Sequence, residues 1–204
     1  MVEEQIQGRR INHPQLIEAM LKTPRHLFVP QEQCESAYDD RALPIGSGQT
    51  ISQPYMVALM TVALDPVPGM KVLEVGTGSG YQAAILAMMG VDLWTVERIA
   101  ALSLRAQNLL TGLGLINVRF RIGDGSKGLA EGSPYDGILV TAGAPDLPSS
   151  LKGQLAEGGR LVIPTGSLGV QDLVVVTRRG DDYHEENHGA CAFVPLVGEE
   201  GWKP

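Results

Sequence analysis

The chain has 204 residues, of which 44% are hydrophobic, and it carries a formal net charge of −7. This length suits a single domain with a sizeable core, and the acidic balance disfavours proteins that bind nucleic acid by neutralising phosphates. The chain has no apolar run long enough to span a membrane and no signal peptide, and its two cysteines lack C-x-x-C spacing, so we expect a cytoplasmic protein.

Short helices are predicted for the N-terminal portion of the domain, residues 1–65. The segment 1–12 predicts a first helix with Ile6 on its inner face. The apolar spacing predicts a second helix at 15–21 and a third at 56–64. Methionines such as Met56 and Met60 in the third helix are more often core residues than cofactor contacts, so we expect them to pack in the core.

The segment 38–55 lies between these helices and is predicted to be a loop. It contains two glycines and two prolines, and polar groups gather at Gln49, Thr50 and Ser52. An irregular segment of this length in a compact domain is often functional. Ser52 also precedes a predicted helix, where serine commonly caps the first turn, so both a functional role and a capping role are open for it.

The segment 71–89 predicts the opening of a nucleotide site. Residues 71–75 predict a strand, the glycine-rich run after them a tight turn, and 82–89 a helix. Glycines allow the backbone to approach a ligand closely, and the start of the helix presents free N–H groups to the same place. An ordinary glycine-rich turn is the alternative.

The spacing of the glycines disfavours a nicotinamide dehydrogenase. A G-x-G-x-x-G/A fingerprint beginning at Gly76 requires Gly or Ala at position 81, where this chain has Tyr81. The pattern is instead E-x-G-x-G-x-G, which resembles motif I of the S-adenosylmethionine-dependent methyltransferases. Glu74, at the tip of the strand, suits a cationic ligand better than an anionic one.

The later elements predict a doubly wound, mostly parallel sheet of about seven strands with helices on both faces. Strands are predicted over 91–96, 118–122, 135–141, 161–165, 173–178 and 190–197, and helices over 99–110 and 149–155. Residues 66–204 would form this core, which together with 1–65 makes one domain.

Two acids follow strands of this sheet. Glu97 ends the second strand, at a spacing from Gly76 that suits hydrogen bonds with the ribose hydroxyls of a nucleotide. Asp124, with Gly125, follows the third strand, where it could accept a hydrogen bond from an adenine amino group. A surface acid at a helix start and an aspartate in a turn are the alternatives.

Two runs together resemble the protein-L-isoaspartate O-methyltransferase family. They are L-P-I-G-S-G-Q-T-I-S-Q-P-Y at 43–55 and V-L-E-V-G-T-G-S-G-Y-Q at 72–82. Other methyltransferases share the second run but not the first. The resemblance spans about residues 15–197, and it implies methyl transfer from S-adenosylmethionine to the α-carboxylate of L-isoaspartyl residues in damaged proteins, with S-adenosylhomocysteine as product and no metal.

The resemblance also implies roles for individual residues. Ser52 would be the catalytic group that positions the acceptor, with Thr50, Ile51 and Val194 as further substrate contacts. The implied cofactor-binding residues are Gln49, Glu74, Gly76, Thr77, Gly78, Ser79, Gly80, Glu97, Asp124, Gly125 and Thr141. A monomer is the implied assembly. His184 and His188 are expected to lie in an exposed loop, without a metal.

The chemistry of a carboxylate acceptor agrees with this set of residues. An α-carboxylate has a pKa of roughly 3.3–3.7, so at neutral pH it is already a nucleophile and needs no general base. Neutral groups that hold an anion, such as Ser52 and Thr50, fit that task. A methyltransferase for another acceptor, and a binding module without activity, remain the competing hypotheses.

Overall fold

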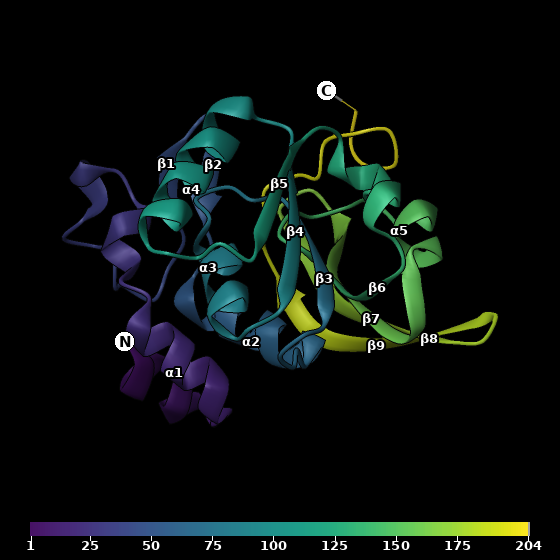
Figure 1. Cartoon of the computed structure of the whole chain (residues 1–204), viewed down its shortest axis with the longest axis horizontal. Helices are drawn as coiled ribbons and strands as arrows, with labels where there is room; N and C mark the ends of the chain where they lie inside the picture. The colour runs from purple at the N-terminus through teal and green to yellow at the C-terminus, as the bar shows by residue number, and fades with distance from the viewer. Residues whose placement is uncertain (204) are drawn as a thin grey trace.

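The computed structural model describes residues 1–203, and its centre is one seven-stranded sheet (Figure 1). The strand order is β5-β4-β3-β6-β7-β8-β9; β5 to β7 are parallel, and the last two strands run antiparallel to their neighbours. This architecture confirms the predicted fold class. The strands are β3 Lys71–Val75, β4 Asp92–Glu97, β5 Val118–Ile122, β6 Tyr135–Val140, β7 Leu155–Ser167, β8 Val170–Arg179 and β9 Asp182–Cys191.

Helices cover both faces of the sheet. Figure 1 shows α2, α3 and α4 on one side of the strands and α5 on the other, with α1 packed outside α2 and α3. The α-helices are α1 Pro14–Lys22, α2 Pro54–Leu64, α3 Tyr81–Met88, α4 Ala100–Gly112 and α5 Ser149–Gly153. Shorter helical turns are η1 Val2–Ile6, η2 Gln7–Arg9, η3 Arg25–Phe28, η4 Gln31–Gln33, η5 Gly125–Lys127 and η6 Ala130–Gly132.

The alternating side chains of the strands divide the core into two clusters. Val72, Leu93 and Leu139 face α2 and α3, where they pack with the N-terminal portion. Leu73, Ile138 and other side chains from the opposite face pack around α5. Both clusters are built from fully buried aliphatic side chains, which hold the strand ends in a fixed position.

Three predicted elements are wrong, two of them in the N-terminal portion and one at the last strand. The segment 1–12 forms the short turns η1 and η2 instead of an α-helix, although Ile6 is buried as expected. The loop at 38–55 contains an antiparallel hairpin of β1 Leu43–Gly46 and β2 Gln49–Ile51.

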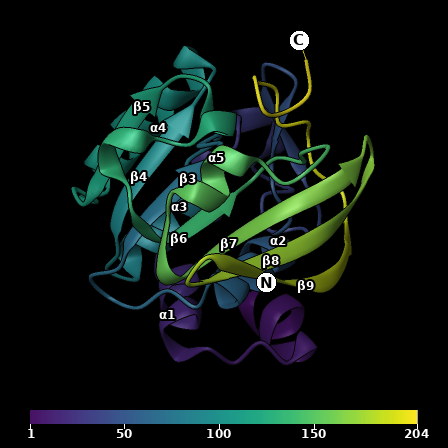
Figure 2. The same ribbon diagram turned by 90° about the vertical axis from the view of Figure 1, so that its right-hand side faces the viewer.

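The final strand lies earlier than the sequence predicts, at Asp182–Cys191, where a loop with His184 and His188 was expected. This strand is polar because it is an exposed edge, and main-chain pairing with β8 stabilises it in a long hairpin (Figure 2). The more apolar segment 190–197 stays in the sheet only at 190 and 191; beyond Cys191 its strand pairing is limited to isolated bridges, between Gly143 and Pro195 and between Val197 and Trp202. Among residues 1–203, no helix has the length and apolar character needed to cross a bilayer.

Candidate active site

The main cavity lies at the carboxyl ends of the central strands. β3 pairs with β4 on one side and with β6 on the other, so the strand order reverses at β3. Ligands of open α/β sheets bind at such a reversal. This space is partly open to solvent. We call it the strand-end cavity; its walls come from 49–52, 75–79, 96–98 and 194–197, with Thr141 and the start of α3.

Gly76 closes the turn after β3 under tight steric limits. Its φ is +93°, and a Cβ there would lie 2.5 Å from the Thr141 hydroxyl oxygen. That hydroxyl donates hydrogen bonds to the carbonyls of Gly76, at 2.5 Å, and Val75, at 3.1 Å. The end of β6 therefore fixes the turn after β3, and only glycine fits at this position.

Glu97 is buried at the end of β4, with 6% of its surface exposed, and it lines the strand-end cavity. One carboxylate oxygen accepts a hydrogen bond from Gly78 N at 3.0 Å and the other from Ile99 N at 2.8 Å. A carboxylate has about four acceptor sites, so these two bonds orient the group and leave capacity for hydroxyl donors of a ligand.

Glu74 does not line the strand-end cavity. It is fully buried, one oxygen accepts a hydrogen bond from the Thr95 hydroxyl at 2.6 Å, and the other oxygen has no partner among residues 1–203. Burial raises the pKa of Glu74 to about 8, so the group is neutral at pH 7. Thr95 is in turn 2.6 Å from the hydroxyl of Thr77, which lines the cavity, so Glu74 reaches the site only through these two side chains.

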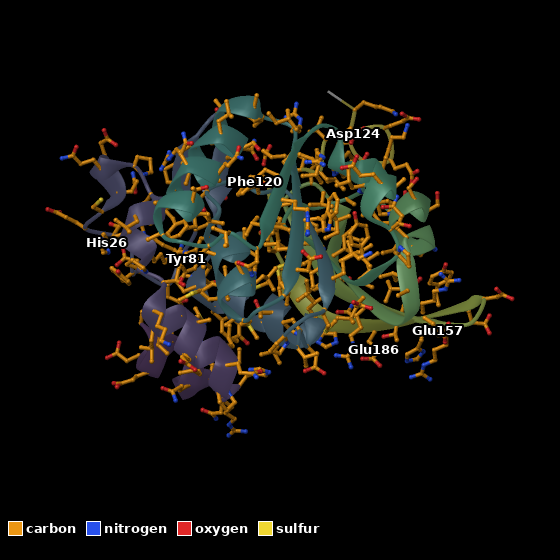
Figure 3. The ribbon with its side chains drawn as sticks, in the orientation of Figure 1. His26, Tyr81, Phe120, Asp124, Glu157 and Glu186 are labelled. Carbon is orange, nitrogen blue, oxygen red and sulfur yellow. The ribbon has the colours of Figure 1, made fainter. Side chains whose placement is uncertain are left out.

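Asp124 and Gly80 also lie outside the cavity lining. Asp124 is exposed and holds the C-terminal segment: one oxygen accepts from Ser126, and the other from Glu199 N at 2.8 Å (Figure 3). Gly80, with φ of +86°, begins α3 and approaches Ala106 of α4, which a Cβ would meet at 3.0 Å.

A second cavity adjoins the first beside the β1–β2 hairpin. We call it the hairpin cavity; it is lined by Ala42, Thr50, Ser52, Gln53, Met56, Thr141 and 190–194. None of these residues is charged at neutral pH. Four of them also line the strand-end cavity and form the boundary between the two spaces: Thr50, Ser52, Thr141 and Val194.

Ser52 presents an unengaged hydroxyl at this boundary. The residue that caps α2 is Gln53, without a side-chain capping bond, so the capping role predicted as the alternative for Ser52 is wrong. The backbone carbonyl of Ser52 accepts a hydrogen bond from Arg25 at 2.7 Å. Within residues 1–203, no hydrogen bond engages the hydroxyl itself, which leaves it available to a ligand.

The structure brings together most of the residues that the sequence indicated. The predicted residues that line the strand-end cavity are Gln49, Thr50, Ile51, Ser52, Gly76, Thr77, Gly78, Ser79, Glu97, Gly125, Thr141 and Val194. Lining residues that the sequence did not indicate include Tyr81, Gln82, Arg98 and Leu196. Tyr81 and Gln82 immediately follow the glycine motif, a signal that could have identified them.

No group of three or more His, Cys, Asp or Glu side chains in the part of the chain that the structure describes could hold a metal ion. His184 and His188 lie on β9, and the shared neighbour of the two rings is Glu186, at 3.3 Å and 3.7 Å.

Comparison with known proteins gives one family. The model of the protein-L-isoaspartate(D-aspartate) O-methyltransferase family matches residues 1–201. The protein-L-isoaspartate O-methyltransferase of Syntrophus aciditrophicus is 55% identical over 205 residues, covering 99% of this chain and 94% of that one. The enzyme of the same name from Methanospirillum hungatei is 51% identical over 203 residues, covering 100% and 94%.

Solved structures agree with this result. One described as a protein-L-isoaspartate O-methyltransferase has a TM-score of 0.89 and 29% identity, covering 98% of this chain and 67% of that one. Another, from Plasmodium falciparum in complex with S-adenosyl-L-homocysteine, has a TM-score of 0.80 and 26% identity, covering 93% and 94%.

Proposed function

Because the chain belongs to the protein-L-isoaspartate(D-aspartate) O-methyltransferase family, we propose that it methylates the α-carboxylate of L-isoaspartyl residues in damaged proteins and peptides, using S-adenosylmethionine. The observation that carries this proposal is the boundary between the two cavities. Thr50, Ser52, Thr141 and Val194 line both, so a ligand in one cavity meets a ligand in the other beside the Ser52 hydroxyl.

The strand-end cavity fits S-adenosylmethionine. Glu97 keeps acceptor capacity that two hydroxyls of a ribose would use, while Gly78 and Ser79 offer a backbone wall without bulky side chains. When bound, this cofactor supplies a methyl group on a sulfonium, whose sulfur keeps the bonding electron pair as the acceptor oxygen bonds to the methyl carbon. The neutral Glu74 adds no negative charge to the cavity wall.

The hairpin cavity fits an acceptor that is already an anion. Its lining contains hydroxyl and amide donors but no carboxylate that would repel the acceptor and no histidine that would act as a base. We propose that the Ser52 hydroxyl donates a hydrogen bond to the acceptor carboxylate and so fixes one oxygen at the boundary. Alignment of this kind, with water excluded, is the main requirement of the transfer.

A labelling experiment tests the proposal directly. The protein is incubated with methyl-labelled S-adenosylmethionine and two peptides that differ only in having L-isoaspartate or L-aspartate at one position. We expect label on the isoaspartyl peptide alone. Mild base should release this label, because a methyl ester hydrolyses under those conditions. Equal labelling of the two peptides, or none, would contradict the proposal, and label on an amine would favour the competing acceptor class.

We further propose a cytoplasmic monomer that acts on damaged proteins and peptides and not on nucleic acids. The net charge of −7 supports the last point, because nucleic acid binding relies largely on cationic contacts with phosphates. Size-exclusion chromatography with light scattering tests the assembly: a mass near 21.8 kDa is expected, and a doubled mass would contradict the monomer.

A further inference from the structure

Arg25 is a fully buried cation without an acidic partner. None of its surface is exposed, and no carboxylate within residues 1–203 forms an ion pair with it. Charged side chains are rarely buried in this way, because desolvation destabilises the charge unless an opposite charge offsets it. Burial lowers the pKa of Arg25 to about 10, so the guanidinium still carries its charge at neutral pH.

Its contacts join the two cavities. Nε donates to the carbonyl of Ala37 at 2.8 Å, and one terminal nitrogen donates to the carbonyl of Ser52 at 2.7 Å. The guanidinium carbon lies 4.8 Å from the centre of the Tyr81 ring, which lines the strand-end cavity at the start of α3 (Figure 3). The other terminal nitrogen has no hydrogen-bond partner in the part of the chain that the structure describes.

The position of this charge complements the hairpin cavity. That cavity has no charged lining residue, and the guanidinium donates a hydrogen bond to the backbone carbonyl of Ser52, which lies at its boundary. Resting on the proposed function, we infer that Arg25 is a positioning residue for the acceptor: it holds the Ser52 peptide in place, and its charge offsets that of the incoming carboxylate.

The charge should act on binding more than on turnover. The acceptor carries its full negative charge before the transfer and loses it as the ester forms, so a fixed cation stabilises the bound acceptor more than the transition state. Removing an interaction that is stronger in the ground state than in the transition state raises KM and does not lower kcat. A purely structural arginine would not distinguish a charged acceptor from a neutral one.

Binding measurements without cofactor test this inference. An isoaspartyl peptide and its α-carboxamide analogue are titrated into wild type, Arg25→Lys and Arg25→Gln by calorimetry. We expect wild type to prefer the carboxylate by roughly ten- to thirty-fold, as a charge at close range in a partly screened site provides. Arg25→Lys, which keeps the charge, should retain most of this preference, and Arg25→Gln should lose it.

Kinetics and controls complete the design. For Arg25→Gln, the KM for the isoaspartyl peptide should rise by a similar factor with kcat within about threefold of wild type, since the charge acts on the ground state. Arg160→Gln is the matched control: that arginine contacts the backbone carbonyl of Ala63 at the far end of α2, away from both cavities, and its loss should leave the preference unchanged. Thermal melts establish that each variant is folded.

The outcomes separate this inference from the proposed function. If wild type methylates the isoaspartyl peptide but Arg25→Gln still prefers the carboxylate, the inference about Arg25 is wrong and the function stands. Equal loss of preference in Arg25→Lys and Arg25→Gln would also overturn it, because the charge would then not be the cause. If wild type modifies neither peptide, the proposed function itself fails.

Discussion

The strand-end cavity and the hairpin cavity are built from different kinds of structure. The first is formed mainly by loops that leave buried parallel strands, and its polar groups are held by internal hydrogen bonds, as in Glu97 and Thr141. The second is formed by a small hairpin and by 190–194, which lie far apart in the chain and are more exposed. A preorganised, buried wall suits one invariant cofactor, whereas an open wall suits acceptors that differ in sequence.

Replacement of Ser52 should have the largest effect and acts at the boundary. In Ser52→Ala the acceptor loses the hydroxyl that fixes it, so we expect kcat for an isoaspartyl peptide to fall by about 100-fold, a typical cost of misplacing a reactant. The affinity for S-adenosylhomocysteine, measured by calorimetry, should change little. Ser167→Ala, at the end of β7, is the control and should behave as wild type. A collapse of cofactor binding would mean that Ser52 contributes mainly to binding the cofactor in the strand-end cavity.

Replacement of Glu97 should affect the strand-end cavity alone. Glu97→Ala removes the proposed ribose contact, and hydrogen bonds to a charged group are worth roughly 1.5–3 kcal/mol, so the affinity for S-adenosylhomocysteine should fall about 10- to 100-fold. Peptide binding should be retained. Glu185→Ala, exposed on β9, serves as the control. Unchanged cofactor affinity would move the ribose away from Glu97.

Replacement of Glu74 should change stability in a pH-dependent way. Its pKa is about 8 in the folded chain and near 4.5 when unfolded, so between these values the folded state holds a proton that the unfolded chain has released. The free energy of unfolding of wild type therefore falls as the pH rises through this window. Glu74→Gln cannot release this proton, so its free energy of unfolding should not fall in this way. In urea denaturation, the difference in unfolding free energy between the variant and wild type should shift in favour of the variant from about pH 5 to about pH 8, by a few kcal/mol at most. If the unfolding free energies of wild type and Glu74→Gln change in parallel with pH, Glu74 is ionised in the folded protein.

Replacement of Asp124 should have the smallest effect. Asp124→Ala removes the acceptor for Glu199 N at an exposed position, which we expect to lower the free energy of unfolding by about 1 kcal/mol. Cofactor affinity should change less than in Glu97→Ala. If it instead falls by a similar factor, Asp124 contacts the cofactor as the sequence indicated, and its role is not confined to holding 198–202.

The sequence predicts the strand-end cavity better than the hairpin cavity, for a physical reason. Parallel strands end at one edge of a sheet, so residues that follow them, such as Gly76 and Glu97, meet in space. Glu74 shows the limit: it lies near a strand tip, but alternate side chains point to opposite faces, and its neighbour Val75 lines the cavity instead.

The hairpin cavity depends on contacts between distant segments, which no local pattern encodes. The polar cluster in the predicted loop already indicated Ser52, whereas Val194 was indicated only by the family resemblance. Arg25 lies in the short turn η3 and makes its contacts with Ala37 and Ser52 across 12 and 27 positions of sequence. A lone arginine near a proline gives no sign of burial, so its position could be found only in the structure.

The placement of 194–197 has a consequence for how the protein is made. These residues form one wall of the strand-end cavity, and Trp202 anchors them: its backbone N–H donates to the Leu196 carbonyl at 2.7 Å, and its indole N–H donates to the Gly143 carbonyl at 3.0 Å. Ribosomes synthesise this wall after every strand of the sheet, because the final strand ends at Cys191. A chain that stops before residue 194 would thus contain the whole glycine motif while still lacking this wall of the binding site.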